Sequence, residues 1–213
     1  MPDDTTRPET VILANGEYPA DGSTAAALLQ NTTRVVCCDG AADSFVRHGG
    51  RPTVIIGDGD SLSRDTLQQF ADITVHVAEQ DTNDLSKAFR HCMSKGWHTI
   101  TILGATGKRE DHTIGNISLL ADYALQADVQ MVTQTGVFNA VHGRASFECR
   151  RGQQVSIFSM TPCSPIHFNG LRYLPPQEGL RSWWSGTLNE AEGETFTIES
   201  ESPALVFRAF ERK

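Results

Sequence analysis

The sequence has little of what marks a secreted or membrane protein. Its five cysteines include no C-x-x-C spacing, so they predict neither a zinc site nor a disulfide framework. Cys37 and Cys38 lie in an apolar run, where a buried thiol is ordinary. No apolar run approaches the roughly 20 residues that span a bilayer. Residues 1–10 are polar and acidic, unlike a signal peptide. We therefore expect a cytoplasmic protein with no membrane segment.

Basic residues are also scarce relative to acidic ones. Lys and Arg number 18 against 26 Asp and Glu, which gives a net charge of −8. Proteins that bind nucleic acids usually present basic patches, so this balance argues against a nucleic-acid partner. The 213 residues suffice for one large domain or two small ones with a substantial core.

The first two thirds of the chain alternate short apolar runs with helical patterns. The clearest helix covers residues 85–93, where apolar residues recur at helical spacing. Such alternation predicts a mostly parallel sheet with flanking helices. The strands are expected at residues 10–14, 35–38, 54–56, 73–77, 99–103 and 129–133.

The pattern changes after about residue 135, where the helical periodicity fades. Short β-like runs at 155–159, 195–198 and 205–207 are separated by Pro, Gly, Asn and Ser. This pattern predicts a small antiparallel β-sandwich. We therefore expect an α/β fold, with an N-terminal domain of parallel sheet and helices over 1–134 and a C-terminal β-sandwich over 135–213.

Aspartates recur where predicted strands end or predicted helices begin. They are Asp39, Asp58, Asp60, Asp84 and Asp111. Ligands of open α/β sheets bind at the carboxyl ends of the strands, so we expect these side chains to open onto one crevice. Like charges in one cleft repel each other unless a divalent cation lies among them, and carboxylate oxygens suit Mg²⁺. The Asp58–Ser61 stretch could also be a turn followed by a helix cap, but the matching aspartates elsewhere favour a metal site.

A glycine-containing turn follows the predicted strand at 99–103. It reads Gly104-Ala105-Thr106-Gly107-Lys108-Arg109. Glycines let the backbone approach phosphate groups closely, and a helix start supplies amides. The two cations at its end are placed to stabilise phosphate charge. The spacing fits neither a Walker A loop nor G-x-G-x-x-G, so the turn predicts a polyphosphate site of another kind.

Three further features have both a structural and a functional interpretation. Asp84 lies at or near a helix start, where it could complement the helix dipole, while Asp81 and Thr82 are the expected caps. A histidine at the position of His112 is more often a hydrogen-bonded residue than a catalyst. Of the paired tryptophans at 183–184, we expect one in the core of the β domain, and the other could stack on an aromatic ligand.

Ordered motifs across nearly the whole chain resemble the thiamine pyrophosphokinase family. They are Asp39-Gly40, Gly57-Asp58-x-Asp60-Ser61, Gln80-Asp81-Thr82-Asn83-Asp84-Leu85, Gly104-Ala105-Thr106-Gly107-x-Arg109-x-Asp111-His112, and the late Gly170-Leu171-x-Tyr173 with Asn189-Glu190. The resemblance implies an N-terminal catalytic α/β domain that binds ATP and Mg²⁺. It also implies a C-terminal β-sandwich that binds thiamine and forms a homodimer. The implied reaction is transfer of pyrophosphate from ATP to thiamine, which releases AMP.

Position by position, the resemblance also implies roles for single residues. The metal would be held by Asp58, Asp60 and Asp111. The nucleotide would contact Asp39, Gly40, Asp58, Gly104, Thr106, Gly107, Lys108, Arg109 and His112. Thiamine would contact Gln80, Asp84, Thr187 and Asn189, the last two from a partner subunit. The catalytic residues would be Asp84, Arg109 and Asp111.

The sequence departs from the family pattern at two positions. Leu188 stands for a serine before Asn189, and Asn83 stands for a threonine before Asp84. From the residues alone, two other functions stay open. One is a metal-dependent phosphoester hydrolase, which the acidic cluster suggests. The other is a nucleotide- or thiamine-binding module without turnover, which the leucine makes conceivable. Thr187 and Asn189 could equally serve a turn.

Overall fold

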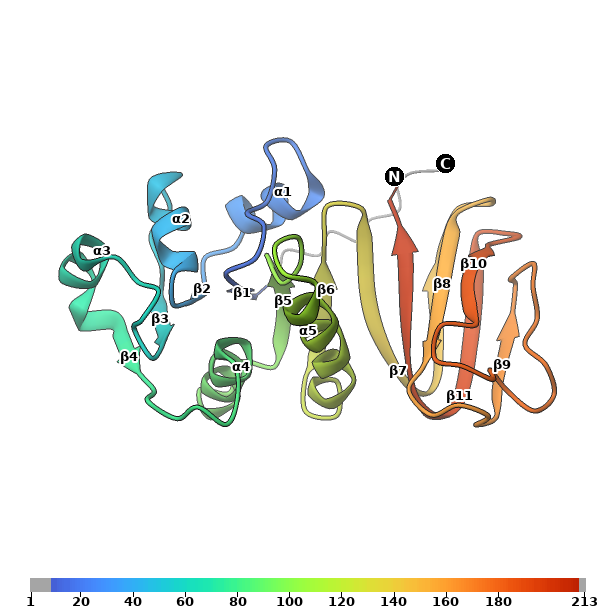
Figure 1. The fold of residues 1–213 in the computed structure, drawn as a ribbon. Coiled ribbons are helices and arrows are strands. Elements are labelled where there is room, and N and C mark those ends of the chain that lie inside the picture. The colour runs from blue at the N-terminus through green and yellow to red at the C-terminus, as the bar shows by residue number, and fades with distance from the viewer. Residues whose placement is uncertain (1–8, 211–213) are drawn as a thin grey trace. The chain divides into compact units, whose positions relative to one another are not determined.

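The computed structural model describes residues 9–210 of the chain (Figure 1). Within them the chain divides into two compact units. The first unit holds the residues up to Leu119 together with Gln126–Gln134. The second holds Leu120–Leu125 together with the residues from Thr135 onward. The expectation of no signal peptide rests on residues 1–10. Residues 1–8 of this stretch lie outside the described residues.

A parallel sheet forms the centre of the first unit (Figure 1). Its spatial order is β6 (Asp128–Val132), β5 (Thr99–Leu103), β1 (Thr10–Leu13), β2 (Val35–Cys38), β3 (Val54–Gly57) and β4 (Thr74–His76). Neighbouring strands in this order pair in parallel. The strands β1, β2 and β3 are buried at every position, which explains why their sequences are apolar runs rather than alternating patterns. The predicted α/β class is confirmed.

Helices connect the strands of this sheet. They are α1 (Thr24–Asn31), α2 (Ala41–Arg47), α3 (Arg64–Gln69), the 3₁₀ helix η1 (Ala71–Ile73), α4 (Asp84–Ser94) and α5 (Glu110–Tyr123). Ser23 and Ser63 cap α1 and α3 by accepting from a backbone N–H. The predicted cap of α4 was wrong, because Asn83 rather than Asp81 or Thr82 accepts the backbone hydrogen bond, from Ser86 at 3.0 Å.

The second unit is built from antiparallel strands. They are β7 (Gly136–Glu148), β8 (Gln154–Ser159), β9 (Ile166–Asn169), β10 (Gly186–Glu190) and β11 (Thr195–Ala209). The long strand β11 pairs with β7, and a register shift between Ser200 and Ala204 separates its β9-paired part from its β8-paired part. This bulge explains why the sequence shows two short apolar runs where the structure has one strand. The predicted antiparallel C-terminal region is confirmed.

Each unit has its own hydrophobic core. Residues from both parts of β11, among them Ile198 and Val206, share one buried cluster with residues of β7, β8 and β9. In the first unit Cys37 and Cys38 are buried, as their apolar surroundings predicted. No helix among residues 9–210 is long and apolar enough to cross a bilayer.

Candidate active site

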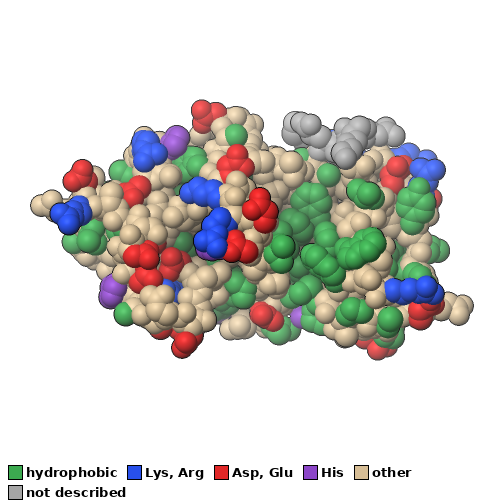
Figure 2. Space-filling model, viewed as in Figure 1, with side chains coloured by type: hydrophobic (Ala, Val, Ile, Leu, Met, Phe, Trp, Pro, Cys, Tyr) green, Lys and Arg blue, Asp and Glu red, His purple; other side chains and the backbone are tan. Residues whose placement is uncertain are grey.

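A cavity of about 560 Å³ opens in the first unit beyond the carboxyl ends of β1, β3 and β5. The loops that follow these strands form its walls together with the starts of α4 and α5. Figure 2 shows acidic and basic side chains gathered close together beside the start of α5. Parallel strands end at the same edge of a sheet, so the topology itself brings these loops together. The predicted residues that line the cavity are Asp58, Asp60, Gln80, Asp84, Thr106, Lys108, Arg109 and His112.

A group of three carboxylates belongs to this site. One oxygen from each of Asp39, Asp58 and Asp60 lies within 4.8 Å of the other two. The backbone N–H of Ser61 donates to Asp39 Oδ2 at 2.8 Å. Burial raises the pKa of Asp39; the bond from Ser61 opposes this shift, and the charges of neighbouring aspartates add to it. Closely spaced hard oxygen ligands of this kind suit a divalent cation.

The backbone holds Asp39 in a constrained position. Its φ of 38° lies in the left-handed region, which Asp tolerates better than most residues. A Cβ at Gly57 would lie 2.6 Å from the Cβ of Asp39, so only glycine fits at the end of β3. Asp39, predicted as a nucleotide contact, thus lies with the predicted metal ligands Asp58 and Asp60 instead of apart from them.

The loop before α4 and its first turns bring further polar groups to the three carboxylates. Gln80 Nε2 donates to Asp58 Oδ2 at 2.9 Å, and this bond lowers the pKa of Asp58. Lys87 Nζ lies 3.0 Å from Asp84 Oδ1 and 3.9 Å from Asp58 Oδ2. Sequence reasoning did not single out Lys87. Its position could have indicated an ion pair, because Lys87 follows Asp84 by three residues on a helix and residues at this spacing are neighbours.

The glycine turn after β5 packs against the loop that follows β1. Gly16 N donates to Gly104 O at 2.6 Å, and a Cβ at Gly104 would lie 2.6 Å from the carbonyl oxygen of Ala14. Gly104 also has a φ of 65°, so this position requires glycine. Lys108 Nζ donates to Asn15 Oδ1 at 3.2 Å. The turn is therefore held by contacts that sequence spacing alone did not reveal.

Arg109 and Asp111 pair with each other at the start of α5. The Arg109 guanidinium donates to both carboxylate oxygens of Asp111, at 3.1 and 2.5 Å. This pairing lowers the pKa of Asp111 to about 2. Asp111 is thus placed beside Arg109 and outside the group formed by Asp39, Asp58 and Asp60.

The start of α5 is tied to the start of α4 and to the glycine turn. The buried Asn116 donates to the carbonyl oxygen of Ala105 at 2.8 Å and accepts from Asn83 Nδ2 at 3.0 Å. His112 and Asn116 both line the cavity, because residues four apart lie on one face of a helix. The cap of α4, the turn and α5 therefore form one connected wall.

A smaller cavity of about 380 Å³ lies in the second unit, and Thr187 and Asn189 are among its lining residues. Asn189 is buried and its amide is engaged: Oδ1 accepts from Tyr173 N at 3.0 Å, and Nδ2 donates to Tyr173 O at 2.6 Å. Leu188 between them has a φ of 59° and is 71% exposed. Asn189 thus supports a wall of this cavity through the backbone of Tyr173.

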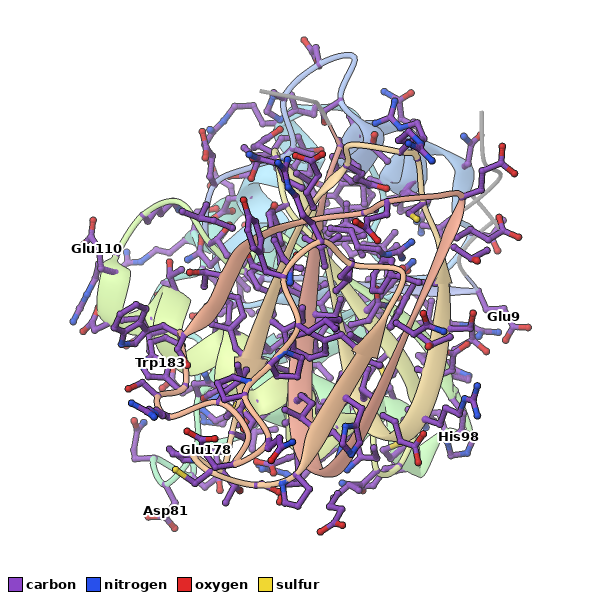
Figure 3. All side chains as sticks on the ribbon, turned by 90° about the vertical axis from the view of Figure 1, so that its right-hand side faces the viewer. Glu9, Asp81, His98, Glu110, Glu178 and Trp183 are labelled. Atoms are coloured by element: carbon purple, nitrogen blue, oxygen red, sulfur yellow. The ribbon has the colours of Figure 1, made fainter. Side chains whose placement is uncertain are left out.

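The tryptophan pair does not contribute to the core. Trp183 and Trp184 are 47% and 58% exposed, so the expectation that one of them is buried in the β-domain core was wrong. Both lie in the loop between β9 and β10, where Figure 3 labels Trp183. The core of this unit is filled mainly by aliphatic and phenylalanine side chains, and neither indole belongs to it.

Comparison with protein families accounts for both units. Residues 25–133 match the catalytic domain of thiamin pyrophosphokinase, and residues 136–207 match its substrate-binding domain. The chain belongs to the thiamin pyrophosphokinase family. The resemblance seen in the ordered motifs is thereby confirmed.

Individual members of the thiamin pyrophosphokinase family are moderately similar to this chain. Thiamine pyrophosphokinase 1 of Arabidopsis thaliana is 30% identical over 180 residues, which cover 75% of this chain and 66% of that protein. Thiamin pyrophosphokinase 1 of Caenorhabditis elegans is 31% identical over 118 residues, 51% of this chain and 48% of that protein. The chain thus spans about half the length of the nematode relative and about two thirds of the plant one.

Solved structures of the family share the fold. A thiamin pyrophosphokinase family protein from Enterococcus faecalis superposes with a TM-score of 0.79 at 18% identity, over 96% of this chain and all of that one. The thiamin pyrophosphokinase of Geobacillus thermodenitrificans has a TM-score of 0.74 at 24% identity, over 95% of this chain and 97% of that one. At these identities the likeness concerns the fold.

Proposed function

We propose that the protein is a thiamine diphosphokinase, which transfers pyrophosphate from ATP to the hydroxyl of thiamine and releases AMP and thiamine diphosphate. One observation carries the proposal. Asp58 and Asp60, which cluster with the buried Asp39, line one cavity together with Lys108 and Arg109 of the glycine turn, in a chain that belongs to the thiamin pyrophosphokinase family. Phosphoryl-type transfer depends mainly on positioning and charge stabilisation, which this cavity offers without a protein nucleophile.

The donor set fits Mg²⁺. Asp39, Asp58 and Asp60 offer hard oxygen ligands, and the repulsion that adds to the raised pKa of Asp39 is relieved by a divalent cation. We assign the metal to Asp58 and Asp60, with Asp39 beside them. Asp111 joins this set in the proposal once phosphate oxygens compete for Arg109 and release its carboxylate. When bound, the metal neutralises charge on the phosphate oxygens.

The remaining residues of the first unit bind the nucleotide and orient the acceptor. The backbone of Gly40, Gly104, Thr106 and Gly107 approaches the nucleotide, and Lys108, Arg109 and His112 supply donors to its phosphates. Gln80 positions thiamine, and Asp84 orients its hydroxyl and accepts the proton as the oxygen attacks the β-phosphorus in line. Arg109 stabilises the charge that develops on the transferred group.

The second unit contributes the rest of the thiamine site in a cytoplasmic homodimer. Thr187 and Asn189 of the partner subunit close the thiamine pocket in this proposal. What supports a partner is the set of exposed apolar side chains on this unit, since clustered exposed apolar side chains often mark interaction sites. Those that border one cavity are Tyr173, Leu174 and Leu188.

The test is a product assay with purified protein, ATP, Mg²⁺ and thiamine. We expect AMP and thiamine diphosphate in equal amounts, and no AMP when thiamine is omitted. Release of phosphate or AMP without thiamine would identify a phosphoester hydrolase instead. Binding of ATP or thiamine without any product would identify a binding module. Either outcome contradicts the proposed transfer.

A further inference from the structure

Lys87 is a buried cation among carboxylates of the first unit. Its side chain is 2% exposed, although it borders the cavity from α4. The other cations that line this cavity, Lys108 and Arg109, are exposed. An ammonium group removed from water is costly unless it is paired, so the position of Lys87 depends on its partners.

The partners of Lys87 come from two different elements. Asp84 begins α4, where its Oδ1 lies 3.0 Å from Lys87 Nζ, and Asp58 follows β3, where its Oδ2 lies 3.9 Å away. The side chains of these aspartates are 32% and 18% exposed, so both are far less accessible than the Arg109–Asp111 pair at 69% and 62%. Lys87 thus links the proposed acceptor-orienting carboxylate to the proposed metal-binding carboxylate.

Two consequences follow from elementary electrostatics. First, the ion pair with Lys87 at 3.0 Å restrains the Asp84 carboxylate beside the cavity, and a group that orients a hydroxyl must be restrained in this way. Second, a fixed positive charge 3.9 Å from Asp58 repels any cation that this carboxylate binds.

We propose that Lys87 is a positioning residue that fixes Asp84 for the acceptor hydroxyl and, at the same time, weakens the affinity of the neighbouring carboxylates for a divalent cation. Because a free divalent cation then binds weakly, the site depends on a nucleotide that carries the cation with it. The part of this inference that concerns Asp84 rests on the proposed function. The part that concerns metal affinity rests on the proposed cation site of Asp58 and Asp60, and not on the reaction.

The experiment measures Mn²⁺ binding to the nucleotide-free protein by electron paramagnetic resonance, together with turnover. In Lys87→Met we expect Mn²⁺ to bind about tenfold more tightly, because a repelling charge is gone. We expect kcat to fall at least tenfold, with a smaller change in the KM for ATP. Lys95→Met is the matched control, because Lys95 is exposed at the C-terminal end of the same helix and should leave both quantities unchanged.

A second variant guards against misfolding of the first. Asp84→Asn leaves Lys87 in place and removes one negative charge, so Mn²⁺ should bind several-fold more weakly. Lys87→Arg should keep the wild-type Mn²⁺ affinity and recover part of the lost turnover. Unchanged or weaker Mn²⁺ binding in folded Lys87→Met overturns the inference, as does tighter binding in Asp84→Asn. If wild-type protein makes no thiamine diphosphate, the proposed function fails while the Mn²⁺ comparison still decides the charge effect.

Discussion

The two units present opposite kinds of surface to a ligand. In the first unit two of the three clustered carboxylates accept hydrogen bonds from neighbouring groups, Asp39 from the backbone of Ser61 and Asp58 from Gln80. In the second unit the smaller cavity is bordered by large apolar side chains, of which Leu174 and Leu188 are 68% and 71% exposed. The first unit therefore holds its charged groups in place before a charged ligand binds. The second unit instead exposes apolar side chains, which are stabilised when a ligand or a partner protein buries them.

This contrast predicts that substitutions in the two units affect different properties of the protein. Substitutions at exposed groups of the charged site, such as Asp60, should alter turnover with little effect on folding, because these side chains bury little surface. Substitutions in the second unit should alter stability or the KM for thiamine, because its buried polar groups support loops rather than reacting atoms. Variants in each unit can test or break this division.

The largest effect is expected at the three carboxylates. Asp60→Asn removes one charged oxygen ligand from an exposed position, so turnover should fall by about a thousandfold or more, the scale of lost transition-state electrostatics. The thermal unfolding midpoint should stay within about 2 °C of wild type, as for surface substitutions. Steady-state AMP release and calorimetry measure the two quantities.

Asp65→Asn is the control for this charge change. Asp65 is exposed in the first turn of α3, five positions along the chain from Asp60, and should leave turnover unchanged. Wild-type turnover in Asp60→Asn would refute the metal assignment. A large loss of stability in the same variant would instead break the division between the units.

The next effect concerns the buried amide of Asn189. Asn189→Ala leaves the backbone N–H and C=O of Tyr173 without their partners, which should lower the free energy of unfolding by about 2 kcal/mol. We expect the KM for thiamine to rise while turnover at saturating thiamine is kept. Urea unfolding measures the first quantity, with Thr187→Ala on the same strand as a control that changes stability by less than about 0.5 kcal/mol. An Asn189→Ala protein as stable as wild type would contradict the supporting role.

A pH-dependent effect is expected at Asp39. Its pKa in the folded protein is raised above the ordinary 3.8, mainly by burial. The folded state therefore holds this proton more tightly than the unfolded state, and stability is lost as pH rises through the two values. In metal-free buffer at pH 7, Asp39→Asn should be more stable than wild type, although inactive.

The difference between Asp39→Asn and wild type should vanish near pH 3, where the aspartate is protonated in both states. Added Mg²⁺ should also reduce it at pH 7, because only the wild-type site gains a neutralising cation there. Urea unfolding at both pH values checks these expectations. A variant less stable than wild type at pH 7 would mean that the charge of Asp39 is compensated within the chain.

Much of the first unit could be predicted because its signals are local. The strands β1, β2 and β3 are short apolar runs, and strand ends in a parallel sheet meet at one edge, so the convergence of Asp58, Asp60 and Asp84 on one cavity follows from the pattern. What could not be predicted depends on side-chain contacts across the sequence. Lys87 reads as an ordinary helix residue until Asp58, 29 positions away, is known to lie beside it. The placement of Asp39 with the metal ligands depends on the backbone of Gly57 in the same way.

The second unit was less predictable because its strands are long and irregular. β7 contains Asn139, His142 and Arg144, and its burial alternates only in part, so no clear period of two marks it. β11 is split by a bulge that hides its continuity. The exposure of the tryptophans could not be predicted from the sequence, since an indole can lie in a core or at an interface.

The smallest effect is expected at Leu188. Its φ of 59° places a branched side chain in the left-handed region, and the side chain is 71% exposed, so little burial offsets the strain. Leu188→Gly removes this strain and should raise the free energy of unfolding by about 0.5 kcal/mol, the balance of relieved strain and added chain entropy. Leu174→Gly is the matched control, because Leu174 is 68% exposed with a negative φ. This variant gains chain entropy without relief of strain, so its free energy of unfolding should fall by about 0.5 kcal/mol. Equal and opposite shifts in urea unfolding would show that the second unit carries local strain at a surface residue. Loss of stability in both variants would mean that the chain entropy added by glycine outweighs the strain relieved at Leu188.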